Sequence, residues 1–205
     1  PAGVTLSEER REQVLDICER AGLLVVEDDP YGMLSFEGDA PLPLRARRRD
    51  GVFYVSTFSK TFAPGLRVGW ILTPHAVREK LVMMSEANIL CPSAFAQGAV
   101  TQYLSTMPWR EQIKVYREIY RERRDAMLDA LRDRMPPGTT WTHPTGGLFV
   151  WATLPEGLDS KAMMPRAIAA RAAYVPGTGF YADGTGRGNM RLNFSFSSPE
   201  RIREG

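Results

Sequence analysis

Apolar residues recur at helical spacing among charged side chains over residues 6–21. Thr5 and Glu8 form a capping-box pattern that predicts Thr5 as the N-cap of this helix, and Gly22 is a suitable C-terminal cap. Residues 23–26 are a short continuous apolar run, which is typical of a strand buried on both faces. A helix followed by a strand is therefore predicted.

β-branched and aromatic residues predict two further strands, at residues 52–58 and 67–73. Residues 37–51, rich in Pro, Arg and Gly, predict a loop. The link at residues 59–65 is too short for a parallel crossover, so we expect the strand at 67–73 to run antiparallel to its neighbour. The order helix, strand, loop, strand is that of an α/β sheet.

Two helical regions follow. Residues 75–105 predict one or two helices, with an interruption near Cys91 and Pro92. Residues 109–134 contain neither Gly nor Pro and predict one long charged helix. Such a helix spans about 40 Å, which suits a bridge between two lobes.

A smaller α+β lobe is predicted beyond this helix. Residues 146–154, 174–175 and 189–195 predict strands, and residues 160–172 predict a helix. Ser198 is a suitable N-cap for a last helix. The predicted domains are residues 1–108, 109–135 and 136–205.

The composition is that of a globular protein, with 43% hydrophobic and 24% charged residues. The formal charge of only +2 argues against a surface that binds nucleic acid. No apolar stretch is long enough to span a membrane, and no export signal is visible, so we expect a cytoplasmic protein.

Residue 1 is Pro, and a helix starting at Ser198 has room for only a turn or so. We therefore expect the chain to be a piece of a longer protein.

Few residues suit a metal or disulfide site. Cys18 and Cys91 are too few for a disulfide framework or a thiolate zinc site. His75 and His143 have no metal-ligand spacing between them. We therefore expect no metal.

The segment after the second predicted strand carries candidate chemistry. Lys60 follows a buried strand, where a lysine amine can form a Schiff base with an aldehyde. The hydroxyls of Thr57 and Ser59 and the guanidinium of Arg67 are a set suited to phosphate. An aldehyde that carries a phosphate is pyridoxal 5′-phosphate. An ordinary solvated lysine beside strand-end hydroxyls fits this spacing equally well.

The acidic segment Glu27–Tyr31 follows the first predicted strand, where α/β proteins place ligands. A carboxylate facing a pyridine nitrogen would keep it protonated and make the ring an electron sink. The Tyr31 hydroxyl is placed to donate to the phenolic oxygen of such a ring. Taken alone, the segment fits a solvated acidic turn better.

Five segments carry a resemblance to a known family. The segments are Pro1–Arg11, Glu27–Tyr31, Ser56–Trp70, Pro144–Trp151 and Asn189–Ser195. Over essentially all 205 residues the chain resembles the class I and II aminotransferases of fold type I, and it is most similar to the branch of 2-aminoadipate and multi-substrate aminotransferases. The resemblance implies a partial fold-type-I α/β fold: the C-terminal part of the large-domain sheet and the small α+β domain.

The resemblance also implies cofactor roles. Lys60 would hold pyridoxal phosphate covalently and then move the substrate α-proton as the general base. Asp28, three residues before Tyr31, would pair with the pyridine nitrogen, and Tyr31 would bond the ring oxygen O3′. The phosphate would be held by Thr57, Ser59 and Arg67.

Arg191 would bind the substrate α-carboxylate as a bidentate pair. From its position in a predicted strand alone, a surface charge is the better interpretation.

The chain also departs from the family pattern. The family's cofactor-contacting Asn would stand just before Pro1 and is absent from the sequence. The family's N-terminal part is absent too, with its substrate-selecting arm, phosphate loop and ring-stacking aromatic residue. Sites of this family borrow residues from a second subunit, so we expect a homodimer and an inactive isolated fragment.

The resemblance implies transamination between an amino acid and a 2-oxo acid, with no nucleic acid or membrane partner. One alternative is the pyridoxal-phosphate-binding sensor domain of a GntR/MocR-type transcription regulator. Such domains often carry Asp-Asp-Tyr where this chain has Asp28-Asp29-Pro30-Tyr31, which favours the enzyme. A second alternative is a lyase or synthase of the same fold.

Overall fold

The computed structural model describes residues 2–205, so Pro1, where one segment of the family resemblance begins, lies outside the described residues. The chain forms two compact units. The first comprises Leu6–Leu34 and Asp39–Lys114. The second comprises the segment ending at Thr5, together with Ser35–Gly38 and Val115–Gly205. The division falls within helix α5 (Trp109–Arg134), and the domain limits expected from the sequence stay a prediction.

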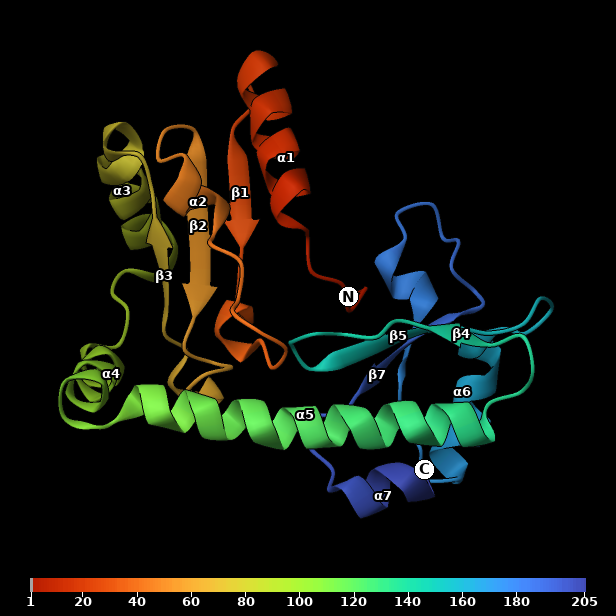
Figure 1. Cartoon of the computed structure of the whole chain (residues 1–205). Helices are drawn as coiled ribbons and strands as arrows, with labels where there is room; N and C mark the ends of the chain where they lie inside the picture. The colour runs from red at the N-terminus through yellow and green to blue at the C-terminus, as the bar shows by residue number, and fades with distance from the viewer. Residues whose placement is uncertain (1) are drawn as a thin grey trace. The chain divides into compact units, whose positions relative to one another are not determined.

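The first unit is built on a three-stranded sheet in the order β1-β2-β3 (Figure 1). Its strands are β1 (Val25–Asp28), β2 (Val52–Thr57) and β3 (Gly69–Leu72). β1 runs parallel to β2, and β3 runs antiparallel to it, as the short connection predicts.

One face of this sheet packs against two helices, α1 (Glu8–Arg20) and α2 (Leu44–Arg47). Val25 and Val52 are paired neighbours on that face and contact Leu15 of α1 and Leu44 of α2. The opposite face carries Val26, which is 68% exposed. The prediction that this strand is buried on both faces is therefore wrong for the described residues, because helices cover only one side.

The start of α1 differs from the prediction. Ser7, not Thr5, is the N-cap, and its side chain accepts a hydrogen bond from the backbone of Arg10. The Thr5 hydroxyl lies 3.2 Å from that of Thr145 instead. The predicted capping box is therefore wrong, because the Thr5 hydroxyl contacts a residue 140 positions away instead of the start of the helix.

Helix α2 lies inside the segment predicted as a loop. Its first backbone amides, at Leu44 and Arg45, donate to the Glu27 carboxylate at 2.9 and 3.2 Å. Because this cap comes from β1 rather than from the adjacent sequence, no local pattern marks the helix.

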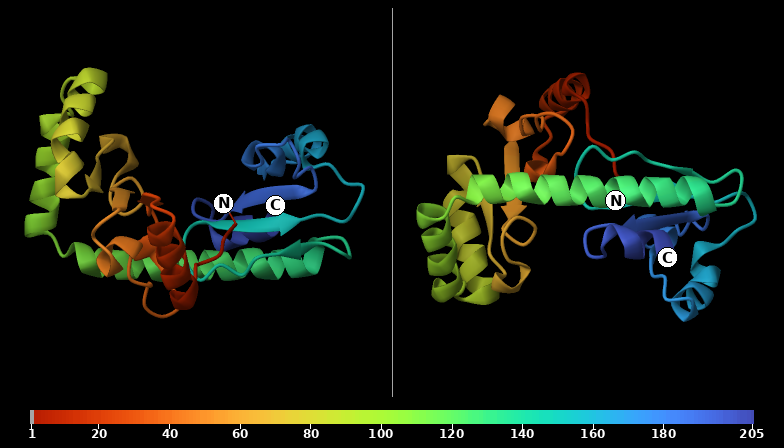
Figure 2. Two further views of the ribbon diagram at one scale, coloured as in Figure 1. Left: turned by 90° about the horizontal axis from the view of Figure 1, so that it is seen from above. Right: turned by 60° about the horizontal axis from the view of Figure 1, so that its bottom comes forward.

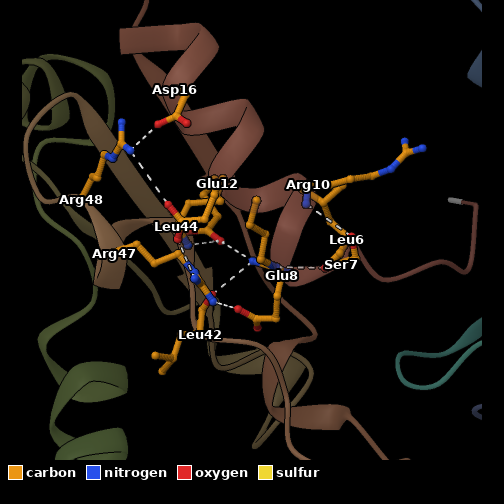
Figure 3. A network of polar contacts seen from close by, with 12 residues as sticks. Leu6, Ser7, Glu8, Arg10, Glu12, Asp16, Leu42, Leu44, Arg47 and Arg48 are labelled. Atoms are coloured by element: carbon orange, nitrogen blue, oxygen red, sulfur yellow. Dashed lines mark hydrogen bonds and ion pairs between the residues drawn. The ribbon is translucent and has the colours of Figure 1, made fainter.

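Ion pairs join α1 to the residues around the end of α2 (Figure 3). Arg47 contacts Glu8 and Glu12, and Arg48 contacts Asp16 and Glu19. The acidic residues are three or four positions apart, so they lie along one face of α1. The pairs therefore hold α2 and its C-terminal end along the length of α1.

The rest of the first unit is mainly helical. The predicted interruption near residues 91–92 is confirmed, because α3 (Arg78–Ile89) ends before α4 (Ala94–Thr106) begins. Three 3₁₀ turns are η1 (Gly32–Leu34), η2 (Pro64–Leu66) and η3 (His75–Val77).

The second unit contains a four-stranded antiparallel sheet in the order β4-β5-β7-β6 (Figure 1). Its strands are β4 (Thr140–Trp141), β5 (Phe149–Thr153), β6 (Val175–Pro176) and β7 (Asn189–Asn193). The other elements are α6 (Ser160–Ala169), the 3₁₀ turn η4 (Gly177–Phe180) and α7 (Pro199–Glu204). Ser198 caps α7 as predicted.

Helices cover one face of this sheet. Val150 of β5 packs with Leu128 of α5 and Ile202 of α7, and Ala152 packs with Met163 of α6. Figure 2 shows the C-terminal part of α5 running alongside these strands. Residues of β5 and β7 that alternate with this set, including Arg191, lie on the opposite face.

A buried arginine ties α5 into the second unit. Arg124 is 3% exposed, and its guanidinium contacts the Glu37 carboxylate and the Pro144 carbonyl oxygen, the latter at 2.7 Å. Its Cζ also lies 5.1 Å from the centroid of the Phe36 ring.

Among the described helices, none is long and apolar enough to cross a membrane.

Candidate functional site

The candidate residues of the first unit gather at one edge of its sheet. β1 and β2 are parallel, so their carboxyl ends meet at the same edge. Asp28 ends β1 and pairs with Val55, so its side chain lies on the same face as that of Thr57, which ends β2. Lys60 follows three residues later, in the turn after β2.

The three consecutive carboxylates at this edge have different surroundings. The carboxylate of Glu27 caps α2 and lies 3.4 Å from Arg11. The carboxylate of Asp29 accepts a hydrogen bond of 3.0 Å from the Tyr54 hydroxyl. The carboxylate of Asp28 is exposed and has no hydrogen bond or ion pair among residues 2–205. Because alternate strand residues face opposite sides, Asp28 alone of the three is open to a ligand.

The contacts of Asp29 hold this turn in place. The Ser56 hydroxyl donates to the Asp29 carbonyl oxygen at 2.7 Å. A Cβ on Gly32 would lie only 2.2 Å from an Asp29 carboxylate oxygen, so the position has no room for a side chain. The pKa of Tyr54 is raised to about 12, mainly by burial and secondly by the negative charge of Asp29. These contacts fix the backbone between Asp28 and Tyr31.

Tyr31 stands at the start of this turn's 3₁₀ segment, and its carbonyl oxygen accepts from the backbone of Leu34 at 2.7 Å. The side chain is half-buried. Its position two residues from Asp29 puts it on the segment that the Asp29 contacts hold.

Thr57, Ser59 and Arg67 are brought together by hydrogen bonds. The Thr57 and Ser59 hydroxyl oxygens are 2.8 Å apart, and Arg67 Nη1 lies 3.4 Å from Ser59 Oγ. Arg67 adopts the left-handed conformation, with φ 54°, which is uncommon for a residue with a Cβ. Two hydroxyls and a guanidinium on one short turn form a site suited to a phosphate group.

The Lys60 amine has no hydrogen bond or ion pair among the described residues, and its side chain is half-buried. The turn that carries it is closed at both sides. The Phe58 amide donates to the Val68 carbonyl oxygen at 3.0 Å, and the Phe62 ring stacks on Tyr103 with centroids 3.8 Å apart. The loop is thus fixed, whereas the amine is not held by any described residue.

Arg191 belongs to the second unit, where it lies in the middle of β7. Its Cζ is 4.1 Å from the ring centroid of Phe149 and 4.9 Å from that of Phe180. Its Nε is buried without a hydrogen-bond partner, and none of the ion pairs of residues 2–205 includes it. It is therefore a cation held between aromatic rings rather than a solvated surface charge.

Sequence reasoning did not find Tyr54 or Phe180. Strand alternation puts Tyr54 on the face of Glu27, but its bond to Asp29 depends on the pairing of β1 with β2. Phe180 reaches Arg191 from η4, which no periodic pattern indicates. No group of three or more metal-binding side chains is found in the described part of the chain.

A family model described as aminotransferase class I and II matches residues 1–205. Aromatic-amino-acid aminotransferase 1 of Thermococcus litoralis is 45% identical over 207 residues, which cover 100% of this chain and 49% of that protein. The 2-aminoadipate transaminase of Thermus thermophilus is 36% identical, covering 95% of this chain and 50% of its own length. The chain thus spans about half the length of these relatives.

A transcription regulator and a solved structure are also similar. The uncharacterized HTH-type transcriptional regulator YisV of Bacillus subtilis is 32% identical over 100% of this chain and 42% of its own length. The crystal structure of Pyrococcus horikoshii kynurenine aminotransferase in complex with PMP superposes with a TM-score of 0.95 and 42% identity, over 100% of this chain and 51% of that one. The expected partial α/β fold of an aminotransferase is confirmed.

Proposed function

This chain belongs to the class I and II aminotransferase family, and we propose that it is part of a pyridoxal-phosphate-dependent aminotransferase. The whole protein moves an α-amino group between an amino acid and a 2-oxo acid. The observation that carries the proposal is the sheet edge of the first unit, where the Lys60 amine, the Asp28 carboxylate and a hydroxyl–guanidinium cluster follow adjacent strands. The amine and the carboxylate have no polar partner among residues 2–205.

The residues present fit the cofactor. The two hydroxyls and Arg67 would hold its phosphate, which offsets the strain of the left-handed backbone at that arginine. Lys60 would hold its aldehyde carbon through the amine nitrogen. When bound, the cofactor supplies an electron-accepting ring that stabilises negative charge at the substrate α-carbon.

Asp28 and Tyr31 would set the protonation of that ring. A carboxylate beside the pyridine nitrogen keeps a proton on it, and Asp28 is the one carboxylate of three whose oxygens are not already engaged. The Tyr31 hydroxyl would donate to the ring oxygen O3′. Lys60, once its amine is released, would take the α-proton of the substrate and return it as a general acid.

Arg191 would bind the substrate α-carboxylate. A guanidinium offers two parallel N–H donors that match the two oxygens of a carboxylate. Its lack of a protein carboxylate among the described residues supports this role, because a salt bridge within the protein would compete with the substrate.

The test uses the full-length protein that contains this chain. In Lys60→Ala we expect loss of the cofactor's visible absorbance band after gel filtration, and loss of transamination by at least about 10⁴-fold. Lys161, exposed at the start of α6, provides a matched control: Lys161→Ala should keep the band and the activity. An unchanged spectrum in Lys60→Ala would contradict the proposal.

We further propose a cytoplasmic homodimer. Support for the cytoplasm comes from Cys18 and Cys91, which are both free thiols, as is usual in a reducing compartment. Support for a dimer comes from the resemblance, because sites of this family are completed by a second subunit. Sedimentation of the full-length protein checks the dimer.

A second candidate is the sensor domain of a transcription regulator, because a regulator covers the whole chain at 32% identity. The same cofactor site would then serve ligand sensing rather than turnover. The two candidates separate in one assay: an enzyme converts a labelled amino acid to its 2-oxo acid, whereas a sensor binds it without net conversion. A lyase or synthase of this fold would release a different product from the same label.

A further inference from the structure

Two phenylalanine rings enclose the guanidinium of Arg191. Phe149 lies two residues before Trp151, the strand partner of Arg191, and so faces the same side of the sheet. Phe180 reaches the cation from η4. Both ring centroids lie within 5 Å of Cζ, at 4.1 and 4.9 Å, well inside the range in which a ring face attracts a cation.

The Phe180 ring is itself supported. The Trp151 ring meets it edge to face, with centroids 5.3 Å apart and an interplanar angle of 81°. The enclosure is thus built from two adjacent strands, β5 and β7, and from η4.

We propose that Phe149 and Phe180 are positioning residues that hold Arg191 ready for a substrate carboxylate; this rests on the proposed function of Arg191. An arginine side chain has several freely rotating bonds, and fixing them on binding costs free energy. The rings remove that freedom before the substrate arrives. Because they are neutral, they hold the cation without pairing its N–H donors, which a protein carboxylate would do.

The test is a steady-state series on the full-length, cofactor-loaded protein. In Phe180→Leu and in Phe149→Leu we expect KM for the amino acid and for the 2-oxo acid to rise about 3- to 30-fold, while kcat changes little. Phe180→Tyr keeps an aromatic ring and should keep a near-normal KM. If Phe149→Leu does not fold, Phe180→Leu and Phe180→Tyr decide the test.

A second readout separates positioning from a general structural role. The amide of the same amino acid lacks the carboxylate, so its kcat/KM should be nearly unaffected by either leucine variant. The dissociation constant of 3-phenylpropionate, a carboxylate that cannot react, should rise with KM in calorimetry. Trp109→Leu is the matched control, because it removes a ring 4.3 Å from another arginine, Arg110, and should change none of these values.

Three outcomes would overturn the proposal: leucine variants with an unchanged KM, equal losses for acid and amide, or a Phe180→Tyr variant as impaired as Phe180→Leu. Arg191→Lys distinguishes the proposed carboxylate-binding role of Arg191 from the positioning role of the two rings. If it leaves KM unchanged, the carboxylate role fails and the enclosure with it. If Arg191→Lys raises KM but the leucine variants do not, only the positioning role fails.

Discussion

The arginines of the α1–α2 contact and the arginine of β7 show two ways of accommodating a guanidinium. Arg47 and Arg48 each face two or more carboxylates of α1, and their charges are balanced within the protein (Figure 3). Arg191 faces two aromatic rings, and no ion pair with the described residues balances it. The first arrangement joins two elements and pairs the terminal guanidinium nitrogens with carboxylates, whereas the second leaves the cation without a carboxylate among the described residues, as the proposed binding of a substrate carboxylate requires.

Arg124 combines the two arrangements. It lies over the Phe36 ring, as Arg191 lies over rings, yet it also pairs with Glu37 and donates to a carbonyl oxygen. Because its Nε and Nη1 nitrogens donate to Asp125, Glu37 and the Pro144 carbonyl oxygen, we assign Arg124 to structure and not to binding. We therefore expect the loss of Arg124 to lower stability and the loss of Arg191 to weaken substrate binding.

The largest effect on stability is expected for Arg124→Met. The change removes a buried cation and leaves the Pro144 carbonyl oxygen without its donor, so the free energy of unfolding should fall by about 3 kcal/mol. Urea denaturation of the full-length protein measures it. KM for amino acids should stay near normal in the folded fraction, and a large rise in KM would contradict the assignment of Arg124 to structure.

The next effect is on substrate binding, in Arg191→Lys. A lysine keeps the charge but cannot reproduce the bidentate pair, so KM for amino-acid substrates should rise about 10- to 100-fold. Stability should change by less than about 1 kcal/mol, because no ion pair within the described residues is lost. A normal KM together with a large loss of stability would show that Arg191 serves structure rather than binding.

Acid should weaken the second unit through Glu37. Its hydrogen bond from Arg124 lowers the pKa of Glu37 below the ordinary value of 4.5. The ionised form is thus favoured by folding, so its contribution is complete above pH 4.5 and is lost as the pH falls through the lowered value. The melting temperature of the normal protein should therefore fall more steeply below pH 4.5 than that of Glu37→Gln. Parallel curves for the two proteins would contradict this account.

The smallest effect is expected for Arg48→Gln. Its carboxylate partners are half-exposed or exposed, so solvent and salt screen these ion pairs. We expect a loss of stability several times smaller than that of Arg124→Met, and one that disappears in 1 M NaCl, in unfolding measured at low and high salt. A loss that persists in high salt would show that packing of the side chain, and not its charge, holds α2.

Sequence reasoning succeeded where structure depends on nearby residues. The helix of residues 109–134 has the predicted bounds, and Ser198 caps α7 as predicted. The start of α1 and the existence of α2 were missed, because Thr5 and Glu27 bond to partners far away in the sequence. Such contacts depend on the complete fold, and no periodicity reports them.

The candidate site divides in the same way. The cluster of Thr57, Ser59 and Arg67 lies on one turn, and the structure brings these three residues together. The spacing to Tyr31 predicts Asp28 rather than Asp29, and strand alternation, which turns Asp29 toward Tyr54, supports the same residue for a different physical reason. The rings around Arg191 required the pairing of β5 with β7 and the position of η4, which the sequence does not specify locally. The roles of these residues stay predictions.

The alternation of the three carboxylates has one further consequence. If β1 were to shift by one residue against β2, every side chain of the strand would change faces. Glu27 would leave α2 uncapped, Asp29 would lose its tyrosine, and Asp28 would turn inward toward the helices. A misaligned strand would therefore lose the cap of α2 and the proposed cofactor contact together, and a molecule that folds with α2 capped has also placed Asp28 on the opposite face of the strand.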